Sequence, residues 1–323
     1  MTDLKIKMAM WDYDRVRPIL DGRVKVRGCE IEFITLPPEE CFYRAYELLE
    51  FDVSEIGFVP YIIAKSRGLN PYTALPVFLS RMFRHSAIYI RNDRLIKKPN
   101  DLTGKTIGVV EYQMSAGMWC RGMLNDIYGI KLTELNWRQG GVNVVGRKEK
   151  FPLNLSDDFP LKAIPEGETL SSMLENGELD AVISPEVPNC FNNGRGNIQR
   201  LFPDFAAVER EYYVQTGHFP IMHALGVRND ILHEHPWLPA ELYRSFTEAK
   251  RLSDIDLFEL RALKIGLPWI ASHAHETVSI MGADFWAYGI EANRHTLEAT
   301  VRYAHEQGLS LGRMEVDELF APC

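Results

Sequence analysis

The sequence predicts an α/β protein of two domains, on three observations. Strand-like apolar runs alternate with helical patterns along much of the chain, an order typical of α/β layers. The chain has 323 residues, a length that suits two domains better than one. A β-branched run at residues 106–110 leads through a polar loop into a helical pattern, a step typical of parallel sheets.

The first part of the chain supplies alternating elements in order. Residues 4–10 alternate apolar and polar side chains, and a second such run ends at Pro37 and Pro38. The prolines and the two glutamates after them favour a helix start, where proline is tolerated and acids complement the helix dipole. The expected elements are strands at 4–10, 29–36, 51–57, 72–78 and 87–90, and helices at 38–49 and 59–67.

The rest of the chain continues the alternation and then becomes helical. We expect strands at 106–110, 179–183 and 223–227, and helices at 116–128 and 169–176. Residues 142–165 are rich in charge and proline, so they predict an irregular loop. Residues 236–320 predict mostly helix, broken at 266–268.

Two halves joined by two crossing segments fit this order. The crossings are expected near residues 90–92 and 219–224. One domain then comprises residues 1–90 with 224–323, and the other comprises residues 91–223. A cleft between such halves, beside the carboxyl ends of parallel strands, is the expected ligand site.

Composition and charge exclude several classes of protein. The chain is 46% hydrophobic and 25% charged, as in ordinary globular proteins, and its formal net charge of −8 argues against a nucleic-acid partner. No apolar stretch approaches a membrane span, and the chain start resembles a strand more than a secretory signal. Five cysteines without a C-x-x-C pair favour reduced thiols. We expect a cytoplasmic protein without membrane partners, and self-association into a homo-oligomer is compatible with the sequence.

The most distinctive cluster of side chains lies at residues 80–86, with the sequence Ser-Arg-Met-Phe-Arg-His-Ser. Arginine offers a planar fork of donors that matches a carboxylate, so this cluster predicts an anion pocket. Arg81, Arg84 and Ser86 are the predicted substrate-binding residues. The two arginines share a pocket only if the chain turns, because neighbouring strand residues face opposite sides. A structural ion pair for one arginine, or a solvated turn, is the competing interpretation.

Two histidines and one carboxylate are the predicted catalytic residues. His85 and His223 suit proton transfer, because the pKa of histidine lies near working pH. Neighbouring cations should lower the pKa of His85. Glu55 follows a strand, and burial in a cleft would raise its pKa and make it an acid. Core histidines bonded to backbone carbonyls, and pairing of Glu55 with Arg15 or Arg81, are the alternatives.

Further polar residues are predicted to bind substrate from both domains. Asp12 and Glu186 follow strands and are expected to face the cleft. Tyr112, Gln113 and Ser115 precede a helix whose first backbone amides can bind a second anionic group.

Two pairs of histidines resemble metal ligands but do not predict a metal site. In each pair the histidines are two positions apart, and on a helix such positions do not share a face. Catalytic zinc usually takes three converging protein ligands. The pairs are His233 with His235 and His273 with His275.

Six separated motifs, in order, resemble the 4,5-dihydroxyphthalate decarboxylase family. They are WDYDRVRPILDGRV (11–24), FDVSEIGF (51–58), PVFLSRMFRHSAIYIR (76–91), DLTGKTIGVVEYQMSAGMWCRG (101–122), HFPIMHALGVR (218–228) and DFWAYGIEANRHTLEA (284–299). The step DLTGKTIGV, with GELDAVIS further on, resembles the type II periplasmic-binding-protein fold. The resemblance implies that α/β fold, with two domains, an interdomain cleft and two crossover segments.

The resemblance also implies an activity. Family enzymes are cytoplasmic carboxy-lyases that convert 4,5-dihydroxyphthalate to 3,4-dihydroxybenzoate (protocatechuate) and carbon dioxide without an organic cofactor. Ring protonation assisted by a para phenol needs an anchor for the substrate's charges, an acceptor for the phenol and an acid near the ring carbon. A cytoplasmic solute-binding protein for an anionic aromatic or other small carboxylate is the alternative.

Overall fold

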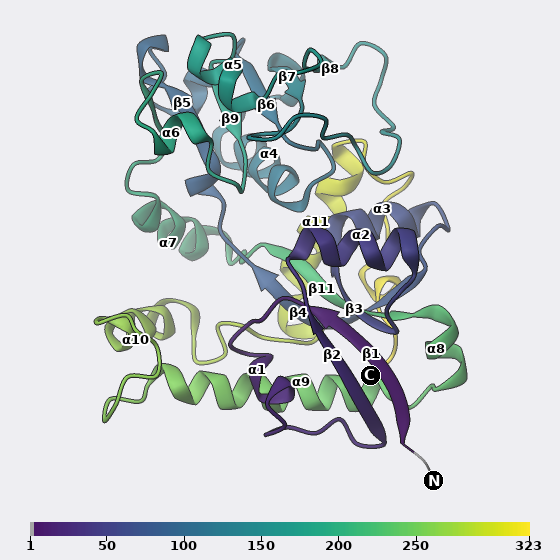
Figure 1. Ribbon diagram of the computed structural model, residues 1–323. Coiled ribbons are helices and arrows are strands. Elements are labelled where there is room, and N and C mark those ends of the chain that lie inside the picture. Colours follow the sequence, from purple (N-terminus) through teal and green to yellow (C-terminus); the bar gives the residue numbers. More distant parts are fainter. Residues whose placement is uncertain (1–2) are drawn as a thin grey trace.

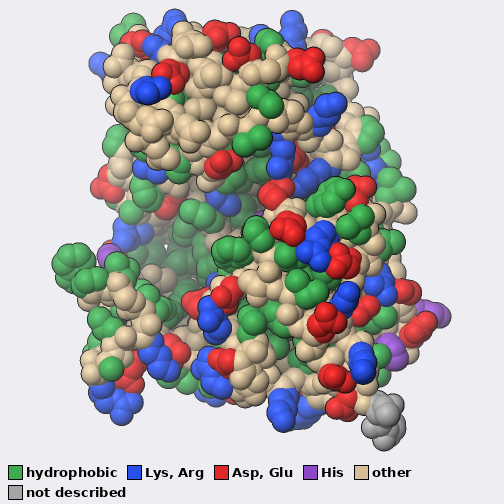
Figure 2. Space-filling model, in the orientation of Figure 1, with side chains coloured by type: hydrophobic (Ala, Val, Ile, Leu, Met, Phe, Trp, Pro, Cys, Tyr) green, Lys and Arg blue, Asp and Glu red, His purple; other side chains and the backbone are tan. Residues whose placement is uncertain are grey.

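The computed structural model describes residues 3–323 and contains two β-sheets with helices packed around them (Figure 1). The strand orders are β2-β1-β3-β11-β4 in the first sheet and β10-β5-β9-β6-β7-β8 in the second. The face of the molecule in Figure 2 is hollowed between its upper and lower parts, and hydrophobic side chains line the hollow. The predicted α/β class with two sheets is confirmed.

The first sheet is parallel except for one returning strand. Its strands are β1 (Leu4–Met10), β2 (Cys29–Thr35), β3 (Val53–Gly57), β4 (Tyr72–Arg81) and β11 (Ile221–Arg228). Strand β11 runs antiparallel between β3 and β4. Every residue of β3 is buried, because β3 is an inner strand and helices α2 (Pro38–Leu48) and α3 (Phe58–Ser66) pack against it.

The second sheet contains three strands that the sequence did not predict. Its strands are β5 (Ile88–Arg91), β6 (Thr106–Val109), β7 (Asn136–Gln139), β8 (Leu161–Ala163), β9 (Ala181–Ile183) and β10 (Ile198–Arg200). Strands β7, β8 and β10 were missed, and β8 lies in the segment expected to be irregular. They are three or four residues long and partly exposed, so the chain shows too little alternation there to indicate a strand. The associated helices are α4 (Ser115–Tyr128), α5 (Leu170–Asn176), α6 (Asn189–Asn192) and α7 (Phe205–Thr216).

Hydrogen bonding of the strands shifts both predicted domain boundaries by a few residues. Strand β5 was placed in the domain of residues 1–90, but it pairs with β9 and β10 of the second sheet. The first crossing therefore occupies residues 82–87. The second crossing ends before Ile221, because all of β11 belongs to the first sheet. The physical reason is that backbone pairing with neighbouring strands decides which sheet a strand joins.

The C-terminal part is helical, as predicted, and one of its helices joins the two halves. Its helices are α8 (Asn229–Glu234), α9 (Leu238–Leu257), α10 (Ile270–Met281) and α11 (Arg294–Glu306), while the short α1 (Arg17–Leu20) packs on α9. Helix α11 contacts α3 of the first half and α4 of the second. The Tyr303 hydroxyl donates to Asp126 at 2.7 Å, and Arg121 Nε donates to Gln307 at 2.8 Å. These contacts fix the two halves together on this side (Figure 1).

Within residues 3–323, no helix combines the length and the apolar character that crossing a bilayer requires.

The α4–α11 contact makes Gly122 a sensitive position. A Cβ atom at Gly122 would lie 2.5 Å from the Tyr303 ring. We expect Gly122→Ala to lower the free energy of unfolding by about 1–3 kcal/mol, because overpacking must displace the ring. Urea denaturation measures this change. Gly117→Ala in the same helix is the comparison, since its Cβ would closely approach one side-chain atom, Arg121 Nη1 at 3.1 Å, and no aromatic ring. Equal losses in both variants would contradict the packing argument.

Candidate active site

A cavity of about 250 Å³ lies between the two sheets, and both halves of the chain supply its walls. It lies beside the carboxyl ends of β3, β6 and β9, where ligand sites of open α/β sheets are found. The linker between the halves supplies Arg84. The first half supplies Pro38, Glu39, Phe42, Gly57, Pro60, Met222 and His223, and the second supplies Glu111, Met114, Ser115, Ala116, Lys150 and Pro185.

His223 is held at the cavity wall by Glu55. Strands β3 and β11 pair antiparallel with Leu225 opposite Glu55, so His223 is the diagonal neighbour of Glu55 on the same face. His223 Nδ1 lies 2.6 Å from Glu55 Oε1. This bond fixes the plane of the imidazole ring. It leaves Nε2 as the ring nitrogen that can serve a ligand.

The Glu55 carboxylate is fully buried and bonded to three donors. Besides His223, it accepts the Tyr13 hydroxyl at 2.6 Å and the Trp11 backbone amide at 2.9 Å. Burial raises the pKa of Glu55, but the hydrogen bond and charge of His223, with the Tyr13 and Trp11 donors, outweigh it and hold the pKa below its ordinary value. The expectation of a raised pKa was therefore wrong. Pairing with His223, and not with Arg15 or Arg81, is the reason.

Arg84 lines the cavity without an acidic partner. Its Nε donates to Met222 Sδ at 3.3 Å and its Nη1 to Met82 Sδ at 3.4 Å, both weak acceptors. No carboxylate among residues 3–323 lies within ion-pair distance of this guanidinium. Burial lowers the pKa of Arg84. Because a partly desolvated charge without a partner is costly, this arrangement indicates a place for a ligand anion.

Arg81 does not line the cavity. Strand β4 continues through Arg81, and the side chain is buried under C-terminal residues. Its guanidinium donates to the Asn293 side-chain oxygen and, at 3.2 Å, to the Ala287 carbonyl. The cluster of residues 80–86 therefore divides into Arg81, which holds the C-terminal segment, and Arg84, which faces the cavity.

His85 and Ser86 also lie away from the cavity, which corrects both predictions. The His85 ring packs against Phe202 and Tyr212, and neither ring nitrogen has a hydrogen-bond partner. Burial, and not neighbouring cations, lowers the pKa of His85 to about 4. The 3₁₀ turn η1 (His85–Ala87) directs the ring into the interior, so His85 is a core histidine, but without the backbone-carbonyl bond that the alternative included. Ser86 contributes its carbonyl, which accepts Arg200 Nε at 3.1 Å.

Of the three residues predicted near the start of this helix, only Ser115, the first residue of α4, reaches the cavity. Its hydroxyl accepts the Val59 amide and donates to the Met222 carbonyl, each at 3.2 Å. It thereby joins α4, α3 and β11. The Gln113 side chain is fully buried, and its Oε1 accepts the Phe151 amide at 3.2 Å.

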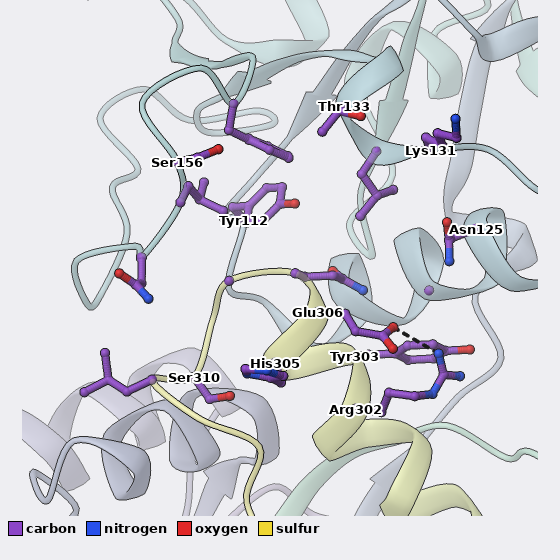
Figure 3. Close-up of a pocket in the computed structure, with 18 residues that line it drawn as sticks. Tyr112, Asn125, Lys131, Thr133, Ser156, Arg302, Tyr303, His305, Glu306 and Ser310 are labelled. Atoms are coloured by element: carbon purple, nitrogen blue, oxygen red, sulfur yellow. Dashed lines mark hydrogen bonds and ion pairs between the residues drawn. The ribbon is translucent and has the colours of Figure 1, made fainter.

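Tyr112 faces a different cavity, of about 680 Å³, beside α4 and α11. Figure 3 shows the Tyr112 ring projecting into it, opposite the α11 residues Arg302 and Glu306, which are 3.0 Å apart. The Tyr112 ring also covers the Arg121 guanidinium, 3.7 Å from the ring centre. None of the other predicted site residues lines this second cavity. The prediction that Tyr112 faces the cleft is therefore wrong.

Asp12 and Glu186 do not line the interdomain cavity either. Asp12 pairs with Arg17 at the start of α1. Glu186 is exposed and accepts Asn143 Nδ2 at 2.8 Å. Both follow strands, as predicted, but the chain turns outward before their side chains reach the cavity.

The histidine pairs lie far from each other in the chain and in different helices or helix ends. His273 approaches Glu276 at 3.9 Å, and His275 Nδ1 lies 2.6 Å from the Ala271 carbonyl. Across residues 3–323, no three His, Cys, Asp or Glu side chains converge as metal ligands.

An ionic network beside the cavity was missed by the sequence analysis. Glu39 of α2 and Glu111 of the β6–α4 loop both pair with Arg147 and with Lys150. The network therefore links the two halves of the molecule. Its cations lie in residues 142–165, where the richness in charge was a signal, but nothing in the chain indicated that this loop folds back over α2.

Comparisons with known proteins give close relatives in sequence. The chain is 40% identical over 322 residues to a 4,5-dihydroxyphthalate decarboxylase of Comamonas testosteroni, which covers 100% of this chain and 98% of that protein. A 4,5-dihydroxyphthalate decarboxylase of Pseudomonas putida is 42% identical over 213 residues, covering 66% of this chain and 83% of that protein. No protein-family model matches the chain.

Solved structures show the same fold at low sequence identity. The periplasmic aliphatic sulphonate-binding protein of Escherichia coli superposes with a TM-score of 0.54 at 11% identity, covering 98% of this chain and 97% of that one. A periplasmic sulfonate-binding protein of Methylobacillus flagellatus gives a TM-score of 0.57 at 14% identity, covering 100% and 93%. The type II periplasmic-binding-protein-like fold is thereby confirmed.

The depressed pKa of Glu55 predicts a pH-dependent contribution to stability. The pKa of an ordinary glutamate is about 4.3, and the pKa of Glu55 in the folded protein lies lower. The ionised Glu55 therefore stabilises the fold fully above the unfolded pKa of about 4.3, and this stabilisation is lost as pH falls through the folded pKa. We expect the free energy of unfolding of the wild type to exceed that of Glu55→Gln by about 1–3 kcal/mol at pH 7. This difference should shrink below about pH 4. Urea denaturation of both proteins across this range measures it. A difference that is constant with pH would contradict the ionised pairing.

Proposed function

The chain belongs to the 4,5-dihydroxyphthalate decarboxylase family, whose members are carboxy-lyases. We propose that it converts 4,5-dihydroxyphthalate to 3,4-dihydroxybenzoate and carbon dioxide. One observation of the site carries this proposal beyond the family relationship. An arginine without an acidic partner and a histidine oriented by a buried glutamate line the same cavity. Those two groups can bind a carboxylate and deliver a proton.

The cavity suits a small aromatic ligand. A cavity of about 150 Å³ holds benzene, so about 250 Å³ leaves room for one ring with several substituents. Phe42 and Pro60 supply apolar walls. In the proposed complex, Arg84 binds the carboxylate that the product retains. Equally tight binding of the departing carboxylate would stabilise the ground state and add nothing to the rate.

His223 is the proposed acid. Decarboxylation replaces the bond from ring carbon to carboxylate by a bond to hydrogen, so each turnover consumes one proton. In the proposal, the imidazolium of His223 donates the Nε2 proton to the ring carbon that bears the departing carboxylate. The ionised Glu55 stabilises the imidazolium by its charge and holds the ring in place. Glu55 is therefore a positioning residue in this scheme.

Other features of the proposal concern the setting of the enzyme. We place it in the cytoplasm, a location that its five free cysteines support, because such thiols persist in reducing compartments. The proposed substrate is an aromatic dicarboxylate, and no organic cofactor is required by the scheme. Association into a homo-oligomer remains a prediction that sedimentation analysis would test.

The anchor is tested by Arg84→Ala. We expect kcat/KM for 4,5-dihydroxyphthalate to fall by about 100-fold to 1,000-fold, because the substrate carboxylate loses its charged partner. Carbon dioxide release and calorimetric binding of 3,4-dihydroxybenzoate measure the effect. Arg261→Ala is the matched control, since Arg261 is exposed and pairs with Glu259 on the surface. Near-normal activity of Arg84→Ala would rule out this anchor.

The proton donor is tested by His223→Asn. We expect kcat to fall by roughly 100-fold to 10,000-fold, the usual contribution of general acid–base catalysis, with less effect on binding of 3,4-dihydroxybenzoate. The shape of the kcat–pH profile should change as well, because the proton donor has been removed. An unchanged profile would assign the proton to another group.

The same assays separate the enzyme from the alternative function. A solute-binding protein would bind 4,5-dihydroxyphthalate and gain thermal stability without releasing carbon dioxide. That result with the wild type would refute the proposed activity.

A further inference from the structure

We propose that Glu111 accepts the proton of the substrate hydroxyl para to the departing carboxylate. This inference rests on the proposed function and assigns the phenol acceptor that a ring-protonation reaction needs. Glu111 was not among the residues predicted from the sequence. The proposal starts from one buried, unsatisfied oxygen atom of Glu111, which is a residue of the cavity wall.

Glu111 is a buried carboxylate whose two oxygens differ in their contacts. The residue is 2% exposed and lines the cavity that contains Arg84 and His223. Its Oε1 accepts a hydrogen bond from Arg147 Nε, whereas its Oε2 accepts none. Lys150 Nζ lies 3.9 Å from Oε2, beyond hydrogen-bond distance. Buried carboxylate oxygens are almost always bonded, so this atom requires a partner.

The chemistry of the cavity indicates which partner fits. An ionised carboxylate only accepts hydrogen bonds, so the partner must be a donor. Ser115 already donates to a backbone carbonyl, Lys150 Nζ stands 3.9 Å from the oxygen, and the proposed scheme assigns the free Nε2 of His223 to the ring carbon. A phenolic hydroxyl is a donor, and its bond to a carboxylate is charge-assisted and strong. Glu111 therefore complements the hydroxyl end of a ring whose carboxylate binds Arg84.

The proposed step balances in atoms and electrons. Glu111 removes the phenolic proton while the His223 imidazolium protonates the ring carbon para to that oxygen, which gives a cyclohexadienone. The bond from this carbon to the carboxylate then breaks, carbon dioxide leaves, and the electron pair returns to the ring to give a phenolate. Glu111 gives its proton back to the phenolate. The only proton consumed is the one from His223, which solvent replaces.

Glu111 also belongs to the ionic network, so a test must separate the two roles. Glu39 also lines the cavity and pairs with the same two cations, Arg147 and Lys150, but the scheme assigns it no ligand contact, so it provides the comparison. The Glu39 side chain is 50% exposed, whereas that of Glu111 is 1% exposed. Glu39→Gln removes the same charge from the network and leaves the unsatisfied oxygen of Glu111 in place.

The experiment compares a hydroxylated ligand with one that lacks hydroxyls. Dissociation constants for 3,4-dihydroxybenzoate and benzoate are measured by calorimetry for the wild type, Glu111→Gln and Glu39→Gln. We expect the wild type and Glu39→Gln to prefer the dihydroxy ligand, and Glu111→Gln to lose roughly tenfold to a hundredfold of that preference. The kcat for 4,5-dihydroxyphthalate should fall in Glu111→Gln as well.

Each remaining outcome decides the matter. Retention of the preference by Glu111→Gln, or equal loss in Glu39→Gln, would overturn the assignment. If Glu111→Gln does not fold, Glu111→Asp keeps the charge but shortens the side chain, and it should lose the preference too. Absence of carbon dioxide release by the wild type refutes the proposed activity, whereas the binding preference is measured independently of turnover and bears on Glu111 alone.

Discussion

The insertion of β11 between β3 and β4 is the constraint on which the site depends. The chain returns from the second sheet as an antiparallel strand, which places His223 diagonal to Glu55 on one face. The same strand presents the Met222 carbonyl to Ser115 and the Met222 sulfur to Arg84. One set of backbone hydrogen bonds thus positions the histidine, the start of α4 and the linker arginine.

The charged groups in and around the cavity differ in how completely their hydrogen-bonding atoms are satisfied. Glu55 is surrounded by three donors and stays ionised, so its contribution is to orient and charge-stabilise His223. Arg84 has only sulfur acceptors, and one oxygen of Glu111 has no donor. Structural ion pairs would be satisfied within the protein. At the cavity, Arg84 and Glu111 are the unsatisfied groups to which we assign a ligand partner.

The two halves are connected on two sides of the molecule by different interactions. Helix α11 binds α4 through buried hydrogen bonds and aromatic packing. Beside the cavity, Glu39 of the first half forms ion pairs with Arg147 and Lys150 of the second half. Exposed ion pairs are weak compared with buried packing. The α11 side is therefore joined by buried contacts, whereas beside the cavity the halves are joined by the Glu39 ion pairs and the Ser115 hydrogen bonds.

The sequence by itself determined the α/β class, nearly all elements of the first sheet, the C-terminal helices and the family, because periodicity, turn residues and linear motifs are local properties. It also indicated Arg84, His223, Ser115 and Glu55 as site residues. Only the tertiary structure decided that Arg81 and His85 turn inward, that Glu55 pairs with His223, and that Glu111 meets the cations of a distant loop. Those outcomes depend on strand order and on how loops fold back, and neither is encoded in the spacing of neighbouring residues.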